Sequence, residues 1–412
     1  MNISSLPIPK TFEEIIKTYE DYYQKFYLEM IRMSNSNFNT YLDNYIKLIE
    51  NLIKSSLYIK NTENLIRAAI GILSLHVFGY DDFDRLIHLY DRILPQTELE
   101  YVKFTSWCAG TLIHHPEIKQ SRYVKHLFTE RIYGWALSRG RRARHLAAAY
   151  LINYLSISAG STVVVFFPTL QSIIWLLVSH HSKKVLRATA DAVFHFVNAI
   201  LQYARNDFNE IMIFFIKLAS KLISFGDSLH IYMGLLLYER LITISPDFFM
   251  TRTLPLCDDI NIFVEDKSEC VSIASYQTIC AFSRVDAARF EATFFDEIIN
   301  KTGEMLNLYP KEVVQSLCLL IKTVPQLLRP IISQLLQFCE QLVSNGHSPF
   351  LLLSKIFKKF KKATIAELQF NQDFLIDLID YPELNQDYFK FIINACKIFL
   401  KSKTDLENKE IE

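Results

Sequence analysis

The segment that decides the fold runs from Arg144 to Ser158 and reads RHLAAAYLINYLSIS. A helical period of 3.6 residues places positions i, i+3, i+4, i+7 and i+8 on one face. Small, apolar or aromatic residues occupy all five positions here, which predicts a helix that buries this face. These residues are Ala147, Tyr150, Leu151, Tyr154 and Leu155.

Segments of the same kind recur along the chain. Each begins with a small or charged residue and continues as a dense apolar helix, and successive starts lie roughly 36 to 44 residues apart. This is the spacing of HEAT and armadillo helix pairs, whose apolar faces are buried only when neighbouring units stack. We therefore predict an all-α, HEAT/armadillo-type α-solenoid of antiparallel helix pairs. The units start near Arg67, Lys103, Arg144, Leu186, Leu229, Glu269 and Val313.

Between these helices the pattern predicts partner helices, and the clearest covers residues 163–178. Pro168 suits its first turn, where a missing backbone N–H costs no hydrogen bond. The same stretch is the most lipid-like of the chain, yet Pro168, Gln171 and Ser172 interrupt it. We therefore expect a buried helix rather than a membrane span.

Composition supports helices and disfavours several other folds. The chain has 412 residues with only 10 glycines and 12 prolines, and 44 basic side chains balance 44 acidic ones. So few turn-forming residues argue against sandwiches, propellers and glycine-rich nucleotide-binding folds. The neutral balance by itself indicates no class of partner.

No linker rich in Ser, Gly or Pro divides the chain, so we predict a continuous array. Residues 1–60 are expected to form an atypical helical cap, residues 61–345 the repeat array, and residues 346–412 C-terminal helices with a frayed, charged tail. The N-terminus shows no secretory signal. The cysteines are odd in number and widely spaced, which favours reduced thiols in the core of a cytoplasmic protein. The cysteines are Cys108, Cys257, Cys270, Cys280, Cys318, Cys339 and Cys396.

Three segments occur in this order: RAAIGILSLHVFGYDDFDRLIHLYDRILPQ from Arg67, YVKHLFTERIYGWALSRGRRARHLAAAYLINYLSISAGSTVVVFFPTLQSIIWLLVS from Tyr123, and LHIYMGLLLYERLITISPDFF from Leu229. Together they resemble the N-terminal HEAT region of the TOR (target of rapamycin) kinases, of the phosphatidylinositol-3-kinase-related family. The second is the most specific, because it joins Trp135 and a Gly-Arg-Arg step to an Ala-rich helix. The resemblance extends from about Leu65 to about Leu306.

This resemblance implies a scaffold in nutrient and growth signalling whose protein partners are a Raptor-like adaptor or other subunits of a TOR complex. The Asp-Phe-Gly motif and the catalytic loop of the kinases are missing. Two alternatives remain open. The chain could be a fragment of such a serine/threonine kinase with its catalytic domain elsewhere, or an unrelated HEAT protein that acts as a transport or trafficking adaptor.

The sequence carries no motif for catalysis, a cofactor or a metal. Phosphoryl transfer needs a loop whose backbone amides approach phosphate, and neither G-x-G-x-x-G nor G-x-x-x-x-G-K-[ST] occurs. A G-x-S-x-G elbow and an H-E-x-x-H helix are also missing, and no C-x-x-C accompanies Cys270 or Cys280. We therefore expect a protein that is not an enzyme.

A cluster of four arginines is the sharpest candidate for partner binding. Cations at the start of a helix oppose the positive end of its dipole, so the arrangement suggests that anions compensate them. These anions could be carboxylates of the next repeat, an acidic surface of a protein partner, or a phosphate-bearing ligand. Nucleic acid is disfavoured, because the chain is neutral and no aromatic residues interleave the cluster. The cluster is Arg139, Arg141, Arg142 and Arg144.

A second basic patch alternates with Ile356, Phe357 and Phe360 in an amphipathic pattern. It suits either the solvated face of a helix or a peripheral contact with an anionic membrane. The patch consists of Lys355, Lys358, Lys359, Lys361 and Lys362.

Two histidine pairs, His114/His115 and His180/His181, fall at predicted helix ends. Adjacent side chains on a helix point in different directions, which disfavours a shared metal. We expect these histidines to bond the last carbonyls of their helices rather than to act in catalysis.

Overall fold

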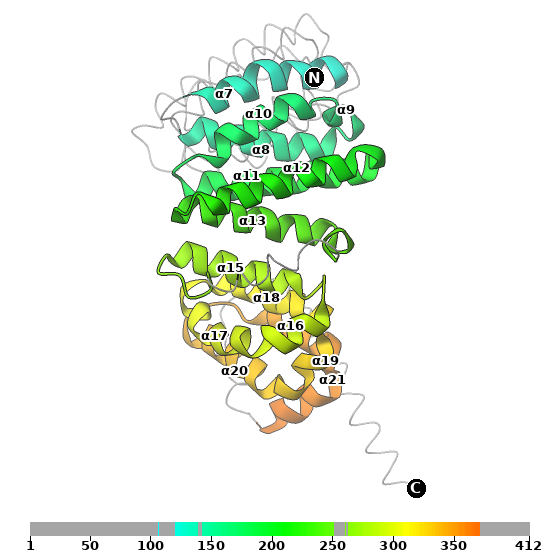
Figure 1. Ribbon diagram of the computed structural model, residues 1–412. Coiled ribbons are helices and arrows are strands. Elements are labelled where there is room, and N and C mark those ends of the chain that lie inside the picture. The colour runs from blue at the N-terminus through cyan, green and yellow to red at the C-terminus, as the bar shows by residue number, and fades with distance from the viewer. Residues whose placement is uncertain (1–105, 107–119, 139–141, 251–259, 261–262, 371–412) are drawn as a thin grey trace, which may run out of the picture. The chain divides into compact units, whose positions relative to one another are not determined.

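The structure, a computed structural model, describes residue 106, residues 120–138, 142–250, residue 260 and residues 263–370 (Figure 1). The chain divides into two compact units, Met1–Phe215 and Ile216–Glu412. The predicted N-terminal cap, the units predicted near Arg67 and Lys103 and the charged tail lie outside the described residues.

The first unit consists of helices in its described part. The π-helical turn η4 directly joins α6 to α7, and α12 crosses into the second unit. The bounds are α6 (Gln120–His126), η4 (Leu127–Ile132), α7 (Tyr133–Leu137), α8 (Arg142–Ser158), α9 (Ser161–Val164), α10 (Phe167–Val178), α11 (Lys183–Tyr203) and α12 (Arg205–Ser224).

The described part of the second unit is also helical, with the 3₁₀ turn η5 after α13 and η6 before α20. The bounds are α13 (Ser228–Ile244), η5 (Pro246–Phe249), α15 (Glu269–Phe282), α16 (Ala287–Thr293), α17 (Phe295–Leu308), α18 (Pro310–Thr323), α19 (Pro325–Leu328), η6 (Arg329–Ile331), α20 (Ile332–Ser344) and α21 (Phe350–Phe370).

The repeat architecture is confirmed. Helices α8, α11, α13, α15, α18 and α21 begin 40 to 45 residues apart. In the first unit α8 packs on α11, and in the second α15 packs on α13 and on α18, which in turn packs on α21. Partner helices pack beside three of these helices, with α10 on α11, α17 on α18 and α20 on α21 (Figure 1). The described residues contain no strand, so the fold is an all-α solenoid of HEAT type.

The predicted buried face of α8 is correct in part. Ala147, Leu151 and Leu155 are fully buried, whereas Tyr150 and Tyr154 are half-buried. A single buried face is too narrow a description, because other side chains of α8 are fully buried too. They include Ala148, Ala149 and Ile152. The reason is that α8 packs on α7, on η4 and on α11, so neighbours surround it.

The partner helix predicted over residues 163–178 is broken in two. α9 ends at Val164, the 76% exposed Val165 follows, and α10 begins at Phe167. Pro168 does lie in the first turn of α10, as expected. Among the described helices none is by itself long and apolar enough to cross a membrane, whereas α18 and residues 325–344, bent by 109°, meet that requirement as a pair.

Polar side chains bond equivalent positions of successive repeats in the second unit. Thr278 Oγ1 of α15 donates to the Leu235 carbonyl of α13 at 3.1 Å, and Arg284 Nη1 donates to the Thr243 carbonyl at 2.7 Å. Gln341 Nε2 of α20 donates to the Gly303 carbonyl of α17 at 2.8 Å. The paired residues are 38 to 43 positions apart, so these bonds fix neighbouring helices at the repeat spacing.

The described cysteines are free thiols, as predicted, and Cys270, Cys280 and Cys339 are buried. Burial raises the pKa of the Cys280 and Cys339 thiols well above their ordinary value. A buried thiol with a raised pKa carries little thiolate and is chemically inert. Cys108, Cys257 and Cys396 lie outside the described residues.

Candidate functional site

The starts of two stacked helices lie side by side in the first unit. α8 and α11 pack on each other, and the rings of His145 in the first turn of α8 and His180, just before α11, meet edge to face at 4.8 Å. The two helices are therefore parallel near their N-terminal ends. Each helix carries a partial positive charge at that end, so the two dipoles reinforce each other at this surface.

Cations gather at these two helix starts. Neither α8 nor α11 carries an acidic residue in its first turn. We call the described residues gathered here the α8–α11 basic surface. They are the exposed Arg142, His181, Lys183 and Lys184, the half-buried Arg144 and His180, and the buried His145.

Two members of the predicted arginine cluster can be placed on this surface. Arg142 begins α8, and Arg144 follows two residues later in the same turn, with its Nε atom buried and without a hydrogen-bond partner. Among the described residues, neither guanidinium forms an ion pair with a carboxylate, so the explanation by carboxylates of the next repeat finds no support there. Arg139 and Arg141 lie outside the described residues.

The hydrogen bonds assign the tautomers of both histidines. His145 Nε2 lies 3.0 Å from the Ala136 carbonyl, which only accepts, so Nε2 carries the proton. His180 Nδ1 accepts the backbone N–H of Ser182 at 2.9 Å, so the proton of its neutral ring is also on Nε2. The bond from Ser182 thus requires a neutral ring at His180, whereas the bond that His145 donates to Ala136 is compatible with a neutral or a protonated ring.

Burial and neighbouring charges favour the neutral rings further. Burial lowers the pKa of His145. Burial, and then the charges of His145, His181 and Arg142, lower the pKa of His180 to about 4. Near neutral pH His145 and His180 therefore add no positive charge to this surface.

The structure corrects the role predicted for His180. The residue follows α10, as expected, but its Nδ1 atom accepts from Ser182, the N-cap residue of α11, instead of donating to the last carbonyls of α10. A neutral imidazole offers a lone pair, and the free backbone N–H before α11 is the donor that it meets. The pair His114/His115 lies outside the described residues.

This arrangement predicts that acid destabilises the first unit. The unfolded chain binds a proton at His180 near pH 6.5, whereas the folded chain binds it only near pH 4. Between these values the unfolded state holds more protons, so stability falls as the pH is lowered through this window. The variant His180→Gln keeps a hydrogen-bond acceptor but cannot titrate. We expect its melting temperature to fall less than that of the wild type when the pH is lowered from 6.5 to 5.

Thermal unfolding followed by circular dichroism at both pH values measures this difference. The matched control is His181→Gln, because His181 is the exposed neighbour of His180 and the Ser182 N–H donates to His180 instead. This control should keep the acid sensitivity of the wild type. An unchanged pH dependence in His180→Gln would contradict the assignment.

The second predicted patch lies on α21. Lys355, Lys358, Lys359 and Lys361 are exposed, whereas Ile356 and Phe357 are buried. The helix is kinked at Phe360, whose φ and ψ are −116° and 17°. The side chain of Lys362 lies outside the described residues. The amphipathic pattern is therefore correct up to the kink.

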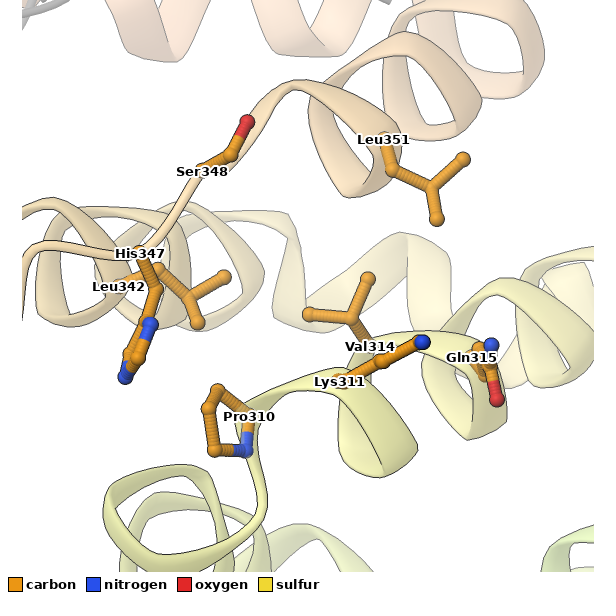
Figure 2. A pocket seen from close by; sticks show the side chains of 8 residues that line it. All are labelled: Pro310, Lys311, Val314, Gln315, Leu342, His347, Ser348 and Leu351. Carbon is orange, nitrogen blue, oxygen red and sulfur yellow. The ribbon is translucent and has the colours of Figure 1, made fainter. Parts of the chain in front are cut away.

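Two pockets of similar size occur in the second unit. One, of about 310 Å³, lies between α18, α20 and the start of α21 (Figure 2). The other, of about 300 Å³, is lined by four acidic and two basic side chains beside apolar ones. In its wall Tyr309 donates to Glu269 at 3.1 Å and Lys301 pairs with Glu304 at 2.9 Å. Among the described residues no group of three or more metal-ligating side chains could hold a metal ion.

Sequence reasoning missed the contact between His145 and His180 and the pocket at α18. The two histidines are 35 positions apart, close to one repeat, so the repeat spacing was the signal that could have paired them. The pocket combines residues of three helices and a loop, and no local pattern marks it.

No protein-family model matches the sequence, and no curated protein matches it either. Among solved structures, the chain aligns with one described as "Kap95p Binding Induces the Switch Loops of RanGDP to adopt the GTP-bound Conformation", at 11% identity and a TM-score of 0.46. The alignment covers 96% of this chain and 53% of that chain, so this chain spans about half its length. An engineered protein aligns at 12% identity and a TM-score of 0.39, over 97% of this chain and 99% of that one. Similarities this low assign no function.

Proposed function

We propose that the chain is a non-enzymatic scaffold that binds protein partners, with the α8–α11 basic surface as one contact site. The observation that carries the proposal is the pair of parallel helix starts that bear cations and no first-turn acid. Two aligned helix dipoles and several exposed cations attract an anionic group. An acidic surface on a partner protein supplies such groups.

The composition and geometry favour a protein over nucleic acid here. The chain as a whole is neutral, whereas a nucleic-acid surface normally brings an excess of basic residues along an extended face. Stacked repeats that each contact only their neighbours form the extended surfaces that solenoid proteins use for protein binding. A phosphate-bearing ligand would meet the same cations and is an outcome of the test below.

A finer proposal is that the chain acts as the N-terminal arm of a TOR-type kinase does, in the cytoplasm and with a Raptor-like adaptor. It is supported by the three collinear sequence segments from Arg67, Tyr123 and Leu229. The second candidate is a transport or trafficking adaptor. Ran, which binds Kap95p in one of the solved structures that align with this chain, is the partner to test for that candidate.

A charge-reversal experiment tests the contact site. We expect Arg142→Glu combined with Lys184→Glu to weaken capture of the cognate acidic partner by about tenfold or more, because two attractions become repulsions. Both side chains are exposed, so the melting temperature should stay within a few degrees of the wild type. Purified Raptor-like adaptor and Ran, in its GDP and GTP forms, are the two partners to be measured by biolayer interferometry.

The matched control is Lys217→Glu combined with Lys322→Glu, which reverses two exposed cations outside this surface. Unchanged capture by the Arg142/Lys184 variant would contradict the contact site. Unfolding of that variant would show that the two cations serve the fold instead. Binding of inorganic phosphate but of neither protein would favour a phosphate-bearing ligand, and Mg²⁺-dependent ATP binding abolished by one substitution would contradict the scaffold.

A further inference from the structure

The pocket between α18, α20 and α21 has an apolar interior. Leu351 extends from the first turn of α21 toward Val314 of α18, while Leu342 of α20 and Pro310 complete the apolar wall (Figure 2). The volume of about 310 Å³ lies at the lower end of the ~300–1,000 Å³ typical of ligand pockets. It offers room for one or two side chains of a peptide rather than for a cofactor.

The polar part of the pocket wall is basic or neutral. Lys311 and His347 are exposed beside the apolar wall, and Gln315 and Ser348 are uncharged. None of the eight lining residues carries a carboxylate. Glu312 lies in the first turn of α18 but does not line the pocket.

The lysines of α21 extend this wall away from the pocket. A helix turns by 100° per residue, so Lys355 and Lys358 lie within about 40° of the direction of Leu351. They follow Leu351 by about one and two turns, roughly 6 and 10.5 Å along the axis. Both lysines are exposed, and the helix stays regular until the kink at Phe360. An apolar pocket and a basic stripe therefore share one surface of the second unit.

We propose that this surface docks a short segment of a partner protein in which one large apolar side chain is followed by acidic residues. The apolar side chain fills the pocket between Val314, Leu342 and Leu351, and the carboxylates meet Lys311, Lys355 and Lys358. Burial of the anchor provides affinity, and the complementary charges fix the direction of the segment. The surface is distinct from the α8–α11 basic surface and goes beyond the function proposed for it.

The concave shape favours a peptide over a membrane. A bilayer presents an extended surface to the lysines, and its lipids would leave the recessed wall formed by Val314 and Leu342 unused. Val314 is 6% and Leu342 1% exposed, so only a side chain that enters the pocket reaches them. This wall is what distinguishes the surface from a simple lysine stripe.

Fluorescence anisotropy with a labelled synthetic peptide tests the proposal on the full chain. The probe has the sequence GLFDEDE, and its control GSSDEDE lacks the apolar anchor. We expect the probe to bind with a dissociation constant below about 1 mM and at least about tenfold more tightly than the control. Weaker binding at high salt is expected, because exposed charges are screened.

Two variants separate the pocket from the lysines. Gln315→Trp, at an exposed lining position, should block the pocket and abolish the preference for the probe over its control. Lys311→Glu combined with Lys355→Glu should weaken the probe by about tenfold. The matched control is Lys322→Glu, an exposed lysine at the other end of α18.

Three results would overturn the proposal. One is equal binding of the probe and its control, another is a Lys311/Lys355 variant that binds like the wild type, and the third is failure of the probe to bind at all. Cosedimentation with phosphatidylserine vesicles that depends on Lys355, without peptide binding, would assign the surface to a membrane. The Arg142/Lys184 variant should bind the probe normally. Failure of peptide docking at α18 and α21 can therefore be told apart from failure of partner binding at the α8–α11 basic surface.

Discussion

Leu151→Ala is expected to lower the free energy of unfolding by about 2–5 kcal/mol, the range for a truncated core leucine. Leu151 lies in the middle of α8 and is completely buried. α8 packs on α7 and on α11, so a cavity at this position affects its own layer and the next one. Because packed helices lie on both sides, neighbouring side chains cannot fill the cavity by moving in from one side. We therefore expect a loss of unfolding free energy in the upper part of that range.

Urea denaturation followed by circular dichroism measures this loss. The control is Lys183→Ala, which truncates an exposed side chain in the first turn of α11 and should change stability by no more than about 0.5 kcal/mol. The two substitutions lie on packed neighbouring helices and differ mainly in burial. Equal losses would show that the burial assigned to α8 is wrong.

Gly234→Ala should destabilise the protein by about 1–3 kcal/mol, although alanine is normally the better helix former. A Cβ atom at Gly234 would lie 2.7 Å from Ile223 Cγ1 and 2.8 Å from the Ala219 carbonyl oxygen. The carbonyl belongs to the backbone of α12 and cannot rotate away. α13 would have to move off α12 to make room.

Gly303→Ala is the matched control, because Gly303 also lies inside a helix, α17. Its new Cβ would be 3.7 Å from Gln341 Oε1 and 3.9 Å from Phe338, both ordinary contacts. The gain in helix propensity should then stabilise the protein by up to about 1 kcal/mol. Opposite signs in thermal unfolding would confirm that close approach of helices, and not propensity, requires Gly234. Stabilisation by both substitutions would contradict this explanation.

The helical repeat could be predicted from sequence because it depends on local period. Starts predicted at Leu186, Leu229, Glu269 and Val313 correspond to helices beginning at residues 183, 228, 269 and 310. Apolar spacing and N-terminal prolines such as Pro310 act within one turn, so no tertiary information is needed. The break between α9 and α10 was missed, because the apolar run continues through the exposed Val165.

The candidate sites could be predicted from sequence only where their charged residues are close together in the sequence. Arg142 and Arg144 were singled out from their density, and the structure adds the helix start of α11 as their neighbour. The neutral state of His180 could not be predicted, because it depends on burial and on residues of another helix. Likewise, Lys355 was identified from sequence, whereas the pocket beside it requires the positions of α18 and α20.

The hydrogen bonds between repeats limit where the chain can change in length. The single O–H of Thr278 is shared between the Ala274 carbonyl of its own helix at 2.7 Å and the Leu235 carbonyl of α13 at 3.1 Å. One residue inserted between Leu235 and the end of α13 leaves this bond in place but rotates Thr243, the acceptor of Arg284, by about 100°. A residue added between α13 and α15 changes neither carbonyl. Insertions and deletions should therefore be tolerated in the connections of the second unit and excluded from its helices.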